Sequence, residues 1–592
     1  MRNQTTNEAW LSRARLDGRI AFAGATFTLA YALVALLDRV GAPERLVSVV
    51  SPYFTVLALA LLGFLLHSMR VSFYYAAGRV VPASYAGLAN AAIFAGLASP
   101  FAAHLTGRSS VVGIAAGFLL GVAGVALLMG PALRKTGAFS LSELLAARFS
   151  QLEPRLGMIV VAAASSALVA FAGYQTAVDG IVGFTGTGRP FAAFFIGAAI
   201  LLIAGPGGLT GVLWSACVAA GVILAGFGLP EFVLALRGFA PPLPLLGDAQ
   251  AWSEAVRRLE AWRLVTPSAG FRLDLTTTLG LGLGVATLAP ALLPAVTTRG
   301  PTGAWRAGAV TLFWSIVIVA LVAAALAASA LTLSRVAVGR APEQLPDALY
   351  SASSCGLLQI CGARVEGPAE ARRACLSRNL APGAPLRAED IAASPEYLIG
   401  GLPQIAKLGA DFSGLVASAV IAAGLILAAA GLHACATAVG HDAVYRLRAE
   451  SALTSRRLAI TRLVLVAVTA LGSATSAANA IDARTLVGLA LAISAAGFVP
   501  VVGLALWPRA QNKDAMVGQS IGVGVMTTVL VTSAGVPTIE TLSWAGLAGG
   551  LLGFGAGAAT ARVWSKETED SRRFVAAILR GDGQVLGEDK GA

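Results

Sequence analysis

The chain has 592 residues, of which 56% are hydrophobic and only 12% are charged, with a mean hydropathy of +0.75 and a formal net charge of +12. A soluble protein carries about twice that charged fraction, so the composition excludes a soluble globular protein. The positive charge does not indicate a nucleic-acid partner, because basic residues of membrane proteins collect in cytoplasmic loops.

Fourteen apolar segments recur along the chain, and a helix of about 20 apolar residues is long enough to cross a bilayer. The sixth segment is short and ends in Gly-Pro-Gly-Gly at 205–208. We therefore expect an all-α integral membrane protein with about 14 transmembrane helices. The segments lie at 19–41, 47–67, 85–105, 111–132, 157–180, 190–206, 209–229, 273–297, 304–332, 411–440, 456–477, 483–507, 515–533 and 540–561.

Basic residues divide unevenly between the two sides of these helices. The loops of one side, together with both ends of the chain, hold most of the lysines and arginines. The short loops of the other side hold only Arg39, Arg45, Arg108, Arg189 and Arg484. The positive-inside rule predicts a multi-pass protein of a bacterial-type inner (plasma) membrane with both termini in the cytoplasm.

Ten of the predicted helices form a core, and further segments lie before and after it in the chain. The predicted parts are a cytoplasmic N-terminus at 1–18, two additional helices at 19–67, a ten-helix core at 85–507, two C-terminal helices at 515–561 and a cytoplasmic tail at 562–592. Two long loops of the core fall on the extracytoplasmic side, at 230–272 and 333–410.

The five cysteines separate into two groups. Cys355, Cys361 and Cys375 lie in the second long loop, where disulfides are stable if the loop is extracytoplasmic. We expect one disulfide and one leftover thiol among these three, with the pairing open. Cys217 and Cys435 lie in apolar segments and are expected to be packing residues. With no zinc-type spacing and only four histidines, we expect no metal site.

Four stretches carry a family resemblance, and they occur in the family's order. Residues 72–96 read SFYYAAGRVVPASYAGLANAAIFAG, and LSELLAARFS (141–150), GGLTGVLWS (207–215) and ATAVGHDAVYR (436–446) follow. These stretches resemble the motifs of the sodium:solute symporter family, and its acetate and monocarboxylate branch most. The resemblance covers most of the chain from Tyr74 to about residue 510.

The resemblance implies a LeuT-like core of 5+5 helices in inverted repeats, with two extra helices on each side. The topology agrees, because five helices is an odd number and the second repeat must then be inverted. In such folds the first helix of each repeat is interrupted near the midplane, where the substrate lies. Glycines and prolines in the helices at 85–105 and 273–297 predict these interruptions.

A substrate site is expected around these two helices. The polar candidates either hydrogen-bond a small solute or join neighbouring helices, and no basic residue is expected to face the pore. The predicted substrate-binding residues are Asn90, Phe94, Gly96, Tyr174, Gln175 and Thr287.

The resemblance also implies a sodium site between the helices at 85–105 and 411–440. Sodium is a hard ion that requires about six oxygen ligands. The matching positions of this chain carry apolar side chains, so we expect the cation site to be degenerate. These positions are Ala92, Ala95, Ala423, Ile426 and Leu427.

Protons are the alternative coupling ion, and His433 is the candidate residue for them. It lies seven residues after Ile426, near the same helix face, and histidine titrates near neutral pH. The other interpretation is a buried structural histidine. Thr437, one turn further along, is the expected partner in either case.

Two functional hypotheses follow from these features. The first is a secondary active transporter of a small solute, most simply an organic acid such as acetate or another monocarboxylate. The second is a transport-inactive relative that acts as a sensor or accessory subunit. No nucleotide-binding loop, nucleophile elbow or acid/base pair indicates an enzyme, and no cofactor beyond Na+ or H+ as coupling ion is expected. The oligomeric state stays open.

Overall fold

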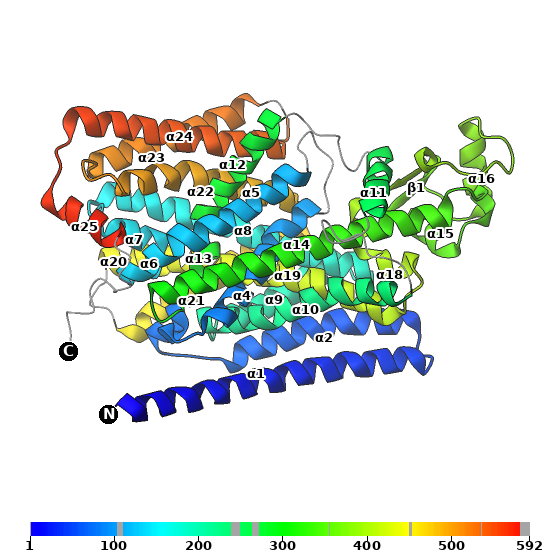
Figure 1. Ribbon diagram of the computed structural model, residues 1–592, viewed down its shortest axis with the longest axis horizontal. Helices are drawn as coiled ribbons and strands as arrows, with labels where there is room; N and C mark the ends of the chain where they lie inside the picture. Colours follow the sequence, from blue (N-terminus) through cyan, green and yellow to red (C-terminus); the bar gives the residue numbers. More distant parts are fainter. Residues whose placement is uncertain are drawn as a thin grey trace.

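Long apolar helices make up almost the whole computed structural model and lie roughly parallel to one axis (Figure 1). The structure describes residues 2–102, 111–237, 249–262, 271–354, 356–448, 453–533 and 535–579. Its long helices are α1 (Arg2–Arg39), α2 (Glu44–Leu65), α4 (Ala83–Ala102), α5 (Val111–Gly124), α8 (Leu152–Thr185), α9 (Arg189–Ala204), α10 (Leu209–Leu236), α12 (Phe271–Thr287), α14 (Pro301–Ala337), α19 (Ala410–Thr437), α21 (Thr454–Ala477), α22 (Ala483–Ala505), α23 (Asn512–Thr532) and α24 (Ile539–Trp564).

Shorter elements continue or connect these helices. Four of them prolong three spans: η2 (Val125–Met129) and α6 (Gly130–Thr136) follow α5, α13 (Ala289–Val296) follows α12, and η5 (Ala438–Tyr445) follows α19. The connecting elements are α3 (Val71–Ala76), η1 (Ala77–Arg79), α7 (Leu141–Ala146), α11 (Ala249–Ala261), η3 (Pro342–Gln344), α15 (Asp347–Ser354), β1 (Leu358–Ile360), α16 (Pro368–Ser377), η4 (Ala388–Asp390), β2 (Ile391–Ala393), α17 (Pro395–Gly400), α18 (Leu402–Ile405), α20 (Arg446–Arg448) and α25 (Glu569–Leu579).

The predicted membrane spans are present in the structure. Among the described residues, twelve helices are long and apolar enough to cross a membrane, and the bent α12–α13 pair brings the number to 13. The remaining predicted segment, the sixth, is the shorter apolar helix α9. Each of the fourteen predicted segments therefore corresponds to a helix.

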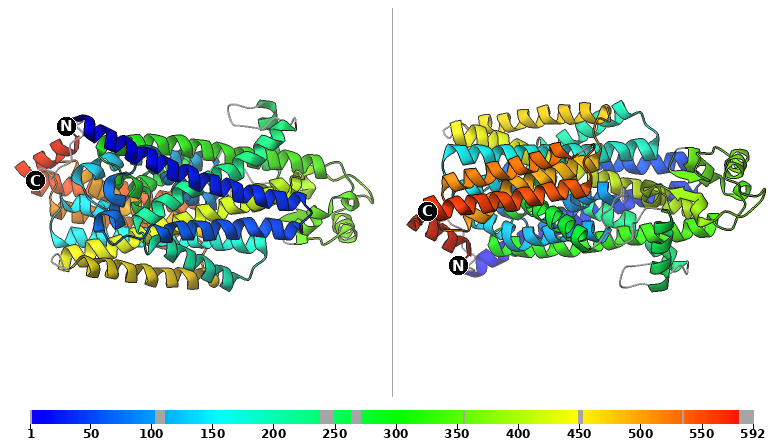
Figure 2. Two further views of the ribbon diagram at one scale, coloured as in Figure 1. Left: turned by 90° about the horizontal axis from the view of Figure 1, so that it is seen from below. Right: turned by 90° about the horizontal axis from the view of Figure 1, so that it is seen from above.

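The bundle has two distinct ends. One end, here called the terminal end, holds the start of α1 together with α7, α20 and α25 (Figure 1). The other, the loop end, holds α15, α16, α18 and β1 (Figure 1). The extra helices lie on opposite flanks of the core, with α1 on one side and α23 and α24 on the other (Figure 2).

The connection between α14 and α19 forms a small folded unit at the loop end. Strands β1 and β2 pair antiparallel, with Leu358 opposite Ala393. A disulfide joins Cys361 to Cys375, which confirms one disulfide among the three loop cysteines. Cys355 lies outside the described residues, whereas Cys217 and Cys435 are free and buried, as expected of packing residues.

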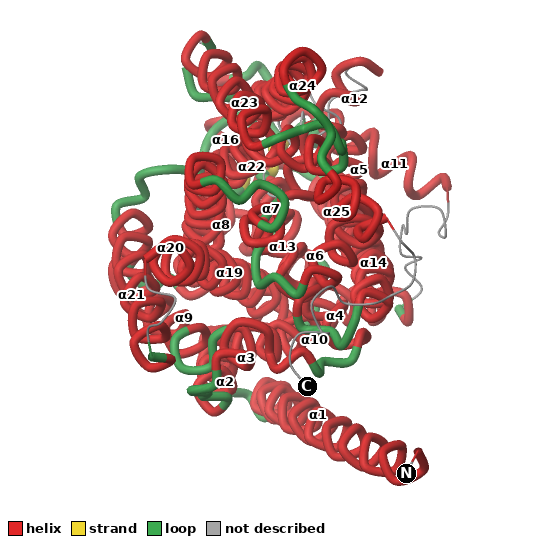
Figure 3. Tube along the Cα trace, turned by 90° about the vertical axis from the view of Figure 1, so that its left-hand side faces the viewer, coloured by secondary structure: helices red, strands yellow, loops and turns green. Residues whose placement is uncertain are grey.

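Helix α19 is the centre of the bundle. Seen from the terminal end, it is surrounded by α4, α8, α10, α13 and α21 (Figure 3). Nearly every residue from Ser413 to Thr437 is buried. Glycine makes this packing close: a methyl group on Gly424 would lie 2.7 Å from the backbone nitrogen of Ala177 in α8. Small residues at such positions allow the backbones of membrane helices to approach each other.

Two predicted features of the helices are wrong. The helix predicted to be interrupted at 85–105 is the continuous α4, and its Gly87 and Gly96 serve close packing against α14 and α19 instead. The helix predicted to end at 229 continues through Pro230 to Leu236. Proline costs a helix interior about 3 kcal/mol, and the burial of Leu234 in the next turn offsets part of that cost.

The predicted interruption of the other first helix is present. Helices α12 and α13 meet at Leu288 with a bend of 47°. Pro290 follows in the first turn of α13, where backbone N–H groups have no helical acceptor, so the lack of an N–H costs no hydrogen bond.

Candidate functional site

A cavity of about 580 Å³ lies inside the bundle, between α4, α5, α8, α10, α14 and α19. Its lining includes Phe94 and Ala95 of α4 and Ala423 of α19. Its rim holds the exposed Asp179, Gln404 and Asp482, so the cavity opens at the loop end. The folded loop unit covers part of the mouth through α17 and α18.

The walls of the cavity are mostly apolar, and two of their hydroxyl groups are without partners. Ser315 of α14 and Tyr397 of α17 are buried, and neither hydroxyl has a hydrogen-bond partner among the described residues. Burial raises the pKa of Tyr397 to about 12, so its hydroxyl stays protonated and able to donate. Buried hydroxyls normally find partners, so these two are suited to a bound solute.

The described lining contains no lysine, arginine or histidine. Its acidic residues lie at the rim, where Asp179 forms an ion pair with Arg189 and Asp482 caps the start of α22. An anion inside the cavity would therefore depend on hydroxyl and backbone donors rather than on a cationic side chain.

Of the six predicted substrate residues, Phe94 lines the cavity. Gly96 is on the same helix but is pressed against the Ala423 carbonyl of α19. The Asn90 amide donates to the carbonyl of Ala291 at 3.2 Å, and so joins α4 to α13 beside the broken helix. The oxygen of the same amide has no partner among the described residues.

The other three predicted substrate residues join helices. The Tyr174 hydroxyl donates to the Ala193 carbonyl at 2.7 Å. Gln175 donates to Asn479 at 2.6 Å, and its neighbour Thr176 is the residue that lines the cavity. The Thr287 hydroxyl is 2.9 Å from the Ser494 hydroxyl, away from the described lining.

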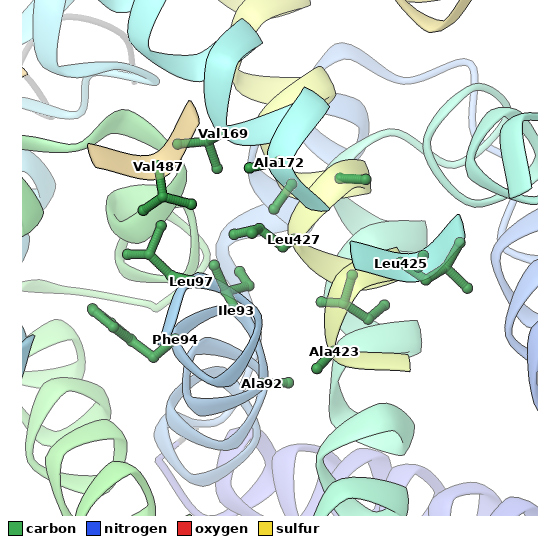
Figure 4. Close-up of a cluster of buried hydrophobic side chains, with 14 of the residues drawn as sticks. Ala92, Ile93, Phe94, Leu97, Val169, Ala172, Ala423, Leu425, Leu427 and Val487 are labelled. Carbon is green, nitrogen blue, oxygen red and sulfur yellow. The ribbon is translucent and has the colours of Figure 1, made fainter. Parts of the chain in front are cut away.

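The predicted cation position is the contact between α4 and α19. Figure 4 shows the apolar side chains that meet there, including Ile93, Leu427 and Ala423. Ala92, Ile426 and Leu427 are buried, and their helices are unbroken, so the backbone carbonyls serve helical hydrogen bonds. Only Ala95 and Ala423 border the cavity. A donor set of this kind does not fit sodium, because dehydration of the ion would go uncompensated.

His433 is fully buried in α19 and is not part of the described cavity lining. Neither ring nitrogen has a partner among the described residues. The rings of Tyr74 and Tyr75 lie against it, with centroids at 5.7 Å and 6.3 Å. Thr437 donates to the backbone carbonyl of His433 at 2.8 Å, so it does not serve the ring.

A polar network joins α7 to η5, the continuation of α19, at the terminal end of the bundle. Asp442 of η5 accepts hydrogen bonds from Ser140 at 2.6 Å and Ser142 at 2.5 Å, both at the start of α7. Its other oxygen is 2.7 Å from Nδ1 of His441. Glu143 of α7 forms an ion pair with Arg446. Glu143, His441 and Asp442 are close enough to share a metal ion. The carboxylates of Glu143 and Asp442, however, already bind Arg446, the two serines and His441.

Sequence reasoning missed several of these residues. Ser315 is an isolated serine in an apolar helix, and Tyr397 lies in a loop whose fold the sequence does not reveal. Glu231 was placed in the loop at 230–272, because the helix before it was predicted to end at 229. The structure instead buries Glu231 in the last two turns of α10. Continued hydrophobicity beyond Pro230, in FVLAL, is the signal that would have extended the helix.

Comparison with known proteins finds one similar sequence and several similar structures. No family model matches the chain. An uncharacterized symporter of Cupriavidus necator is 24% identical over 611 aligned residues, which cover 85% of this chain and 87% of that protein.

Among solved structures, the fold is shown by one symporter. A Na+-coupled sialic acid symporter in a substrate-bound, outward-open state superposes with a TM-score of 0.61 at 16% identity, over 88% of this chain and 98% of that one. Mhp1, a nucleobase-cation-symport-1 family transporter, superposes with a TM-score of 0.44 at 14% identity, over 86% of this chain and all (100%) of Mhp1. These relatives are transporters and not enzymes. The chain has the LeuT-type transporter fold, with two extra helices on each side of its ten-helix core.

Proposed function

We propose that the protein is a secondary active transporter that moves a small organic solute across the membrane by alternating access. The observation that carries this proposal is the cavity, which reaches from the α4–α19 contact to the loop end, whereas the Asp442 network joins α7 to η5 at the terminal end. A site reached from one side at a time is what alternating access requires. The symporter name of the Cupriavidus relative and the LeuT-type fold support this proposal.

The proposed orientation puts the loop end outside the cytoplasm. The disulfide between Cys361 and Cys375 at this end supports it, because disulfides persist in oxidising compartments. The basic loops of the terminal end also support it. The protein would then lie in a bacterial-type inner membrane with both termini in the cytoplasm, and the cavity would face outward.

The proposed solute is an organic acid of the monocarboxylate class. This part of the proposal rests on the resemblance to the acetate and monocarboxylate branch. In a cavity without a described basic side chain, the hydroxyls of Ser315 and Tyr397 would donate to the carboxylate. The mostly apolar walls and the volume of about 580 Å³ favour acids with a longer apolar chain than acetate.

Sodium coupling at the family's position is not part of the proposal, because Ala92, Ile426 and Leu427 offer no side-chain oxygen. We propose protons as the coupling ion, with His433 as the candidate that sequence reasoning identified. The missing sodium ligands also favour the second candidate function, a transport-inactive sensor or accessory subunit.

Uptake into liposomes tests these alternatives. We expect purified, reconstituted protein to take up labelled acetate, propionate or pyruvate in response to a pH gradient and not to a sodium gradient. Protein-free liposomes control for passive entry of the neutral acids. Sodium-driven uptake would contradict our interpretation of the α4–α19 contact, and loss of proton-driven uptake in His433→Ala would support the histidine. No uptake of these or of a wider set of solutes would favour the sensor or accessory role.

Replacement of Tyr397 by phenylalanine tests the cavity itself. If the Tyr397 hydroxyl donates to the solute, its removal should weaken binding by about 1 kcal/mol or more, which raises the KM for uptake about fivefold. Tyr350→Phe is the matched control, since the Tyr350 hydroxyl lies in the same folded loop unit and donates to the Pro342 carbonyl at 2.6 Å. An equal KM for the two variants would remove Tyr397 from the site.

A further inference from the structure

Glu231 is a buried carboxyl group that has no hydrogen-bond partner among the described residues. It lies in the last two turns of α10 and is 4% exposed. Neither of its side-chain oxygens has a hydrogen-bond partner within the described part of the chain. Acidic residues inside membrane helices are rare and normally pair with a donor or a cation, so an unpaired one requires an explanation.

The charged groups around α10 do not supply a partner. The helices packed against α10 include α2, α4, α9, α14 and α19. Within the described residues none of their charged side chains forms an ion pair with Glu231, and α4 carries none at all. The charged residues on the loop-end turns of the other four helices are Glu44, Arg45, Arg189, Arg335 and Asp411.

Glu231 stands next to the wall of the cavity. Ile223 and Phe227 line the cavity from α10, and Glu231 follows Phe227 by one helical turn on the same face. This part of α10 also packs against α14: a methyl group on Gly228 would lie 3.8 Å from the side chain of Leu321. Leu321 is next in sequence to Val322, which lines the cavity. The carboxyl group is therefore close to the solute space but is shielded from it in this state.

Helix α10 also touches the central helix of the bundle. A methyl group on Gly226 would be 2.5 Å from the Cβ of Ala419 in α19. A change in the contact between these two helices would change what surrounds Glu231, one and a half turns further along α10. Alternating access involves rearrangements of this kind between helices around a central site.

An ionised carboxylate in this position would have no donor among the described residues to replace its water shell. The free energy required is many kcal/mol, so the group is buried as the neutral acid. If water reaches Glu231 in another state of the transport cycle, the acid can release its proton. We propose that Glu231, rather than His433, is the proton-binding residue that couples solute movement to a pH gradient. This inference rests on the proposed transport function.

The other acidic and basic groups near the cavity are less suited to this role. Asp179 is paired with Arg189 and accepts from Gln175 at 3.3 Å. Asp482 caps α22 and lies 3.5 Å from Arg484. His433 is packed between the tyrosines of α3, away from the described lining. Glu231 alone among these four combines an unpaired carboxyl with a place one turn from a lining residue.

Transport by the Glu231→Gln variant tests the proposal, because glutamine keeps the size of the side chain and cannot release a proton. A pH difference of about one unit drives about tenfold accumulation when one proton accompanies each solute. We expect Glu231→Gln to lose this accumulation and to retain exchange of labelled for unlabelled solute. The solute is whichever of acetate, propionate and pyruvate the wild type transports. Asp514→Asn is the control that should keep both activities, because Asp514 is a buried carboxylate that accepts from Ser565 and is not part of the described cavity lining.

Each outcome has a distinct meaning. Undiminished proton-driven accumulation in Glu231→Gln, or loss of exchange together with accumulation, would overturn the proposal. Transport by the wild type without any response to a pH gradient would overturn it and leave the transport function standing. No transport at all would instead contradict the proposed function.

Infrared spectroscopy of the reconstituted wild type gives an independent test that needs no solute. A buried neutral acid shows a C=O stretching band, which we expect at neutral pH and which Glu231→Asp should shift. If Glu231→Gln folds, the band should disappear. Absence of any such band in the wild type at neutral pH would overturn the proposal even if the glutamine variant fails to fold.

Discussion

Replacement of Gly431 by valine is expected to prevent stable folding of the bundle. A methyl group at this position would lie 2.7 Å from the backbone nitrogen of Ala170 in α8 and 2.9 Å from the carbonyl oxygen of Ser166. Because both contacts are with backbone atoms, no side-chain movement relieves them, and α8 and α19 must separate. Overpacking at a close contact costs about 1–3 kcal/mol and occasionally more, and valine adds three carbon atoms here.

The effect should be large because α19 is the central helix and contacts α8 more extensively than any other element. Thermal unfolding in detergent, followed by size-exclusion chromatography, should show a lower melting midpoint or an aggregated Gly431→Val protein. Gly221→Val is the matched control, since a methyl group on Gly221 in α10 meets nothing within 4 Å. Equal midpoints for the two variants would mean that α8 and α19 are not held as closely as described.

The sequence predicts the spans well because a bilayer sets their length and their apolar composition. Helix breaks are harder to predict, since glycine and proline have more than one use in a membrane. The glycines of α4 permit contact with α14 and α19, whereas Pro290 marks a real break between α12 and α13. Pro230 lies inside a continuous helix, because packing of the turn after it stabilises the helical conformation.

The candidate site was only partly predictable. Alignment of motifs correctly brought α4 and α19 together, and Phe94, Ala95 and Ala423 border the cavity. The motif alignment could not identify Ser315 or Tyr397, because only the structure shows which buried hydroxyls lack a hydrogen-bond partner. The polar residues that the sequence singled out, such as Tyr174 and Thr287, have partners in neighbouring helices.

Replacement of Asp442 by alanine is expected to open the terminal end. The variant would leave the hydroxyls of Ser140 and Ser142 and the ring of His441 without their shared acceptor. Hydrogen bonds to a charged group contribute about 1.5–3 kcal/mol each, so α7 should detach from the end of α19. If closure of this end alternates with opening of the cavity, the variant should shift the protein toward a state open to the cytoplasm.

Cys435 reports on this change, because it is free, buried and two turns before Asp442 in the same continuous helical span. In a Cys355→Ser background, we expect maleimide labelling of Cys435 to rise strongly in Asp442→Ala, while that of Cys217 in α10 stays low.

Asp514→Ala is the matched control: Asp514 is an equally buried carboxylate that accepts from Ser565 at 2.6 Å, but it joins α23 to the end of α24. Destabilisation without selective labelling would make the Asp442 network a structural support. Labelling in Asp442→Ala alone would identify it as the closure of the terminal end, since both variants remove a buried carboxylate and only one of them lies between α7 and α19.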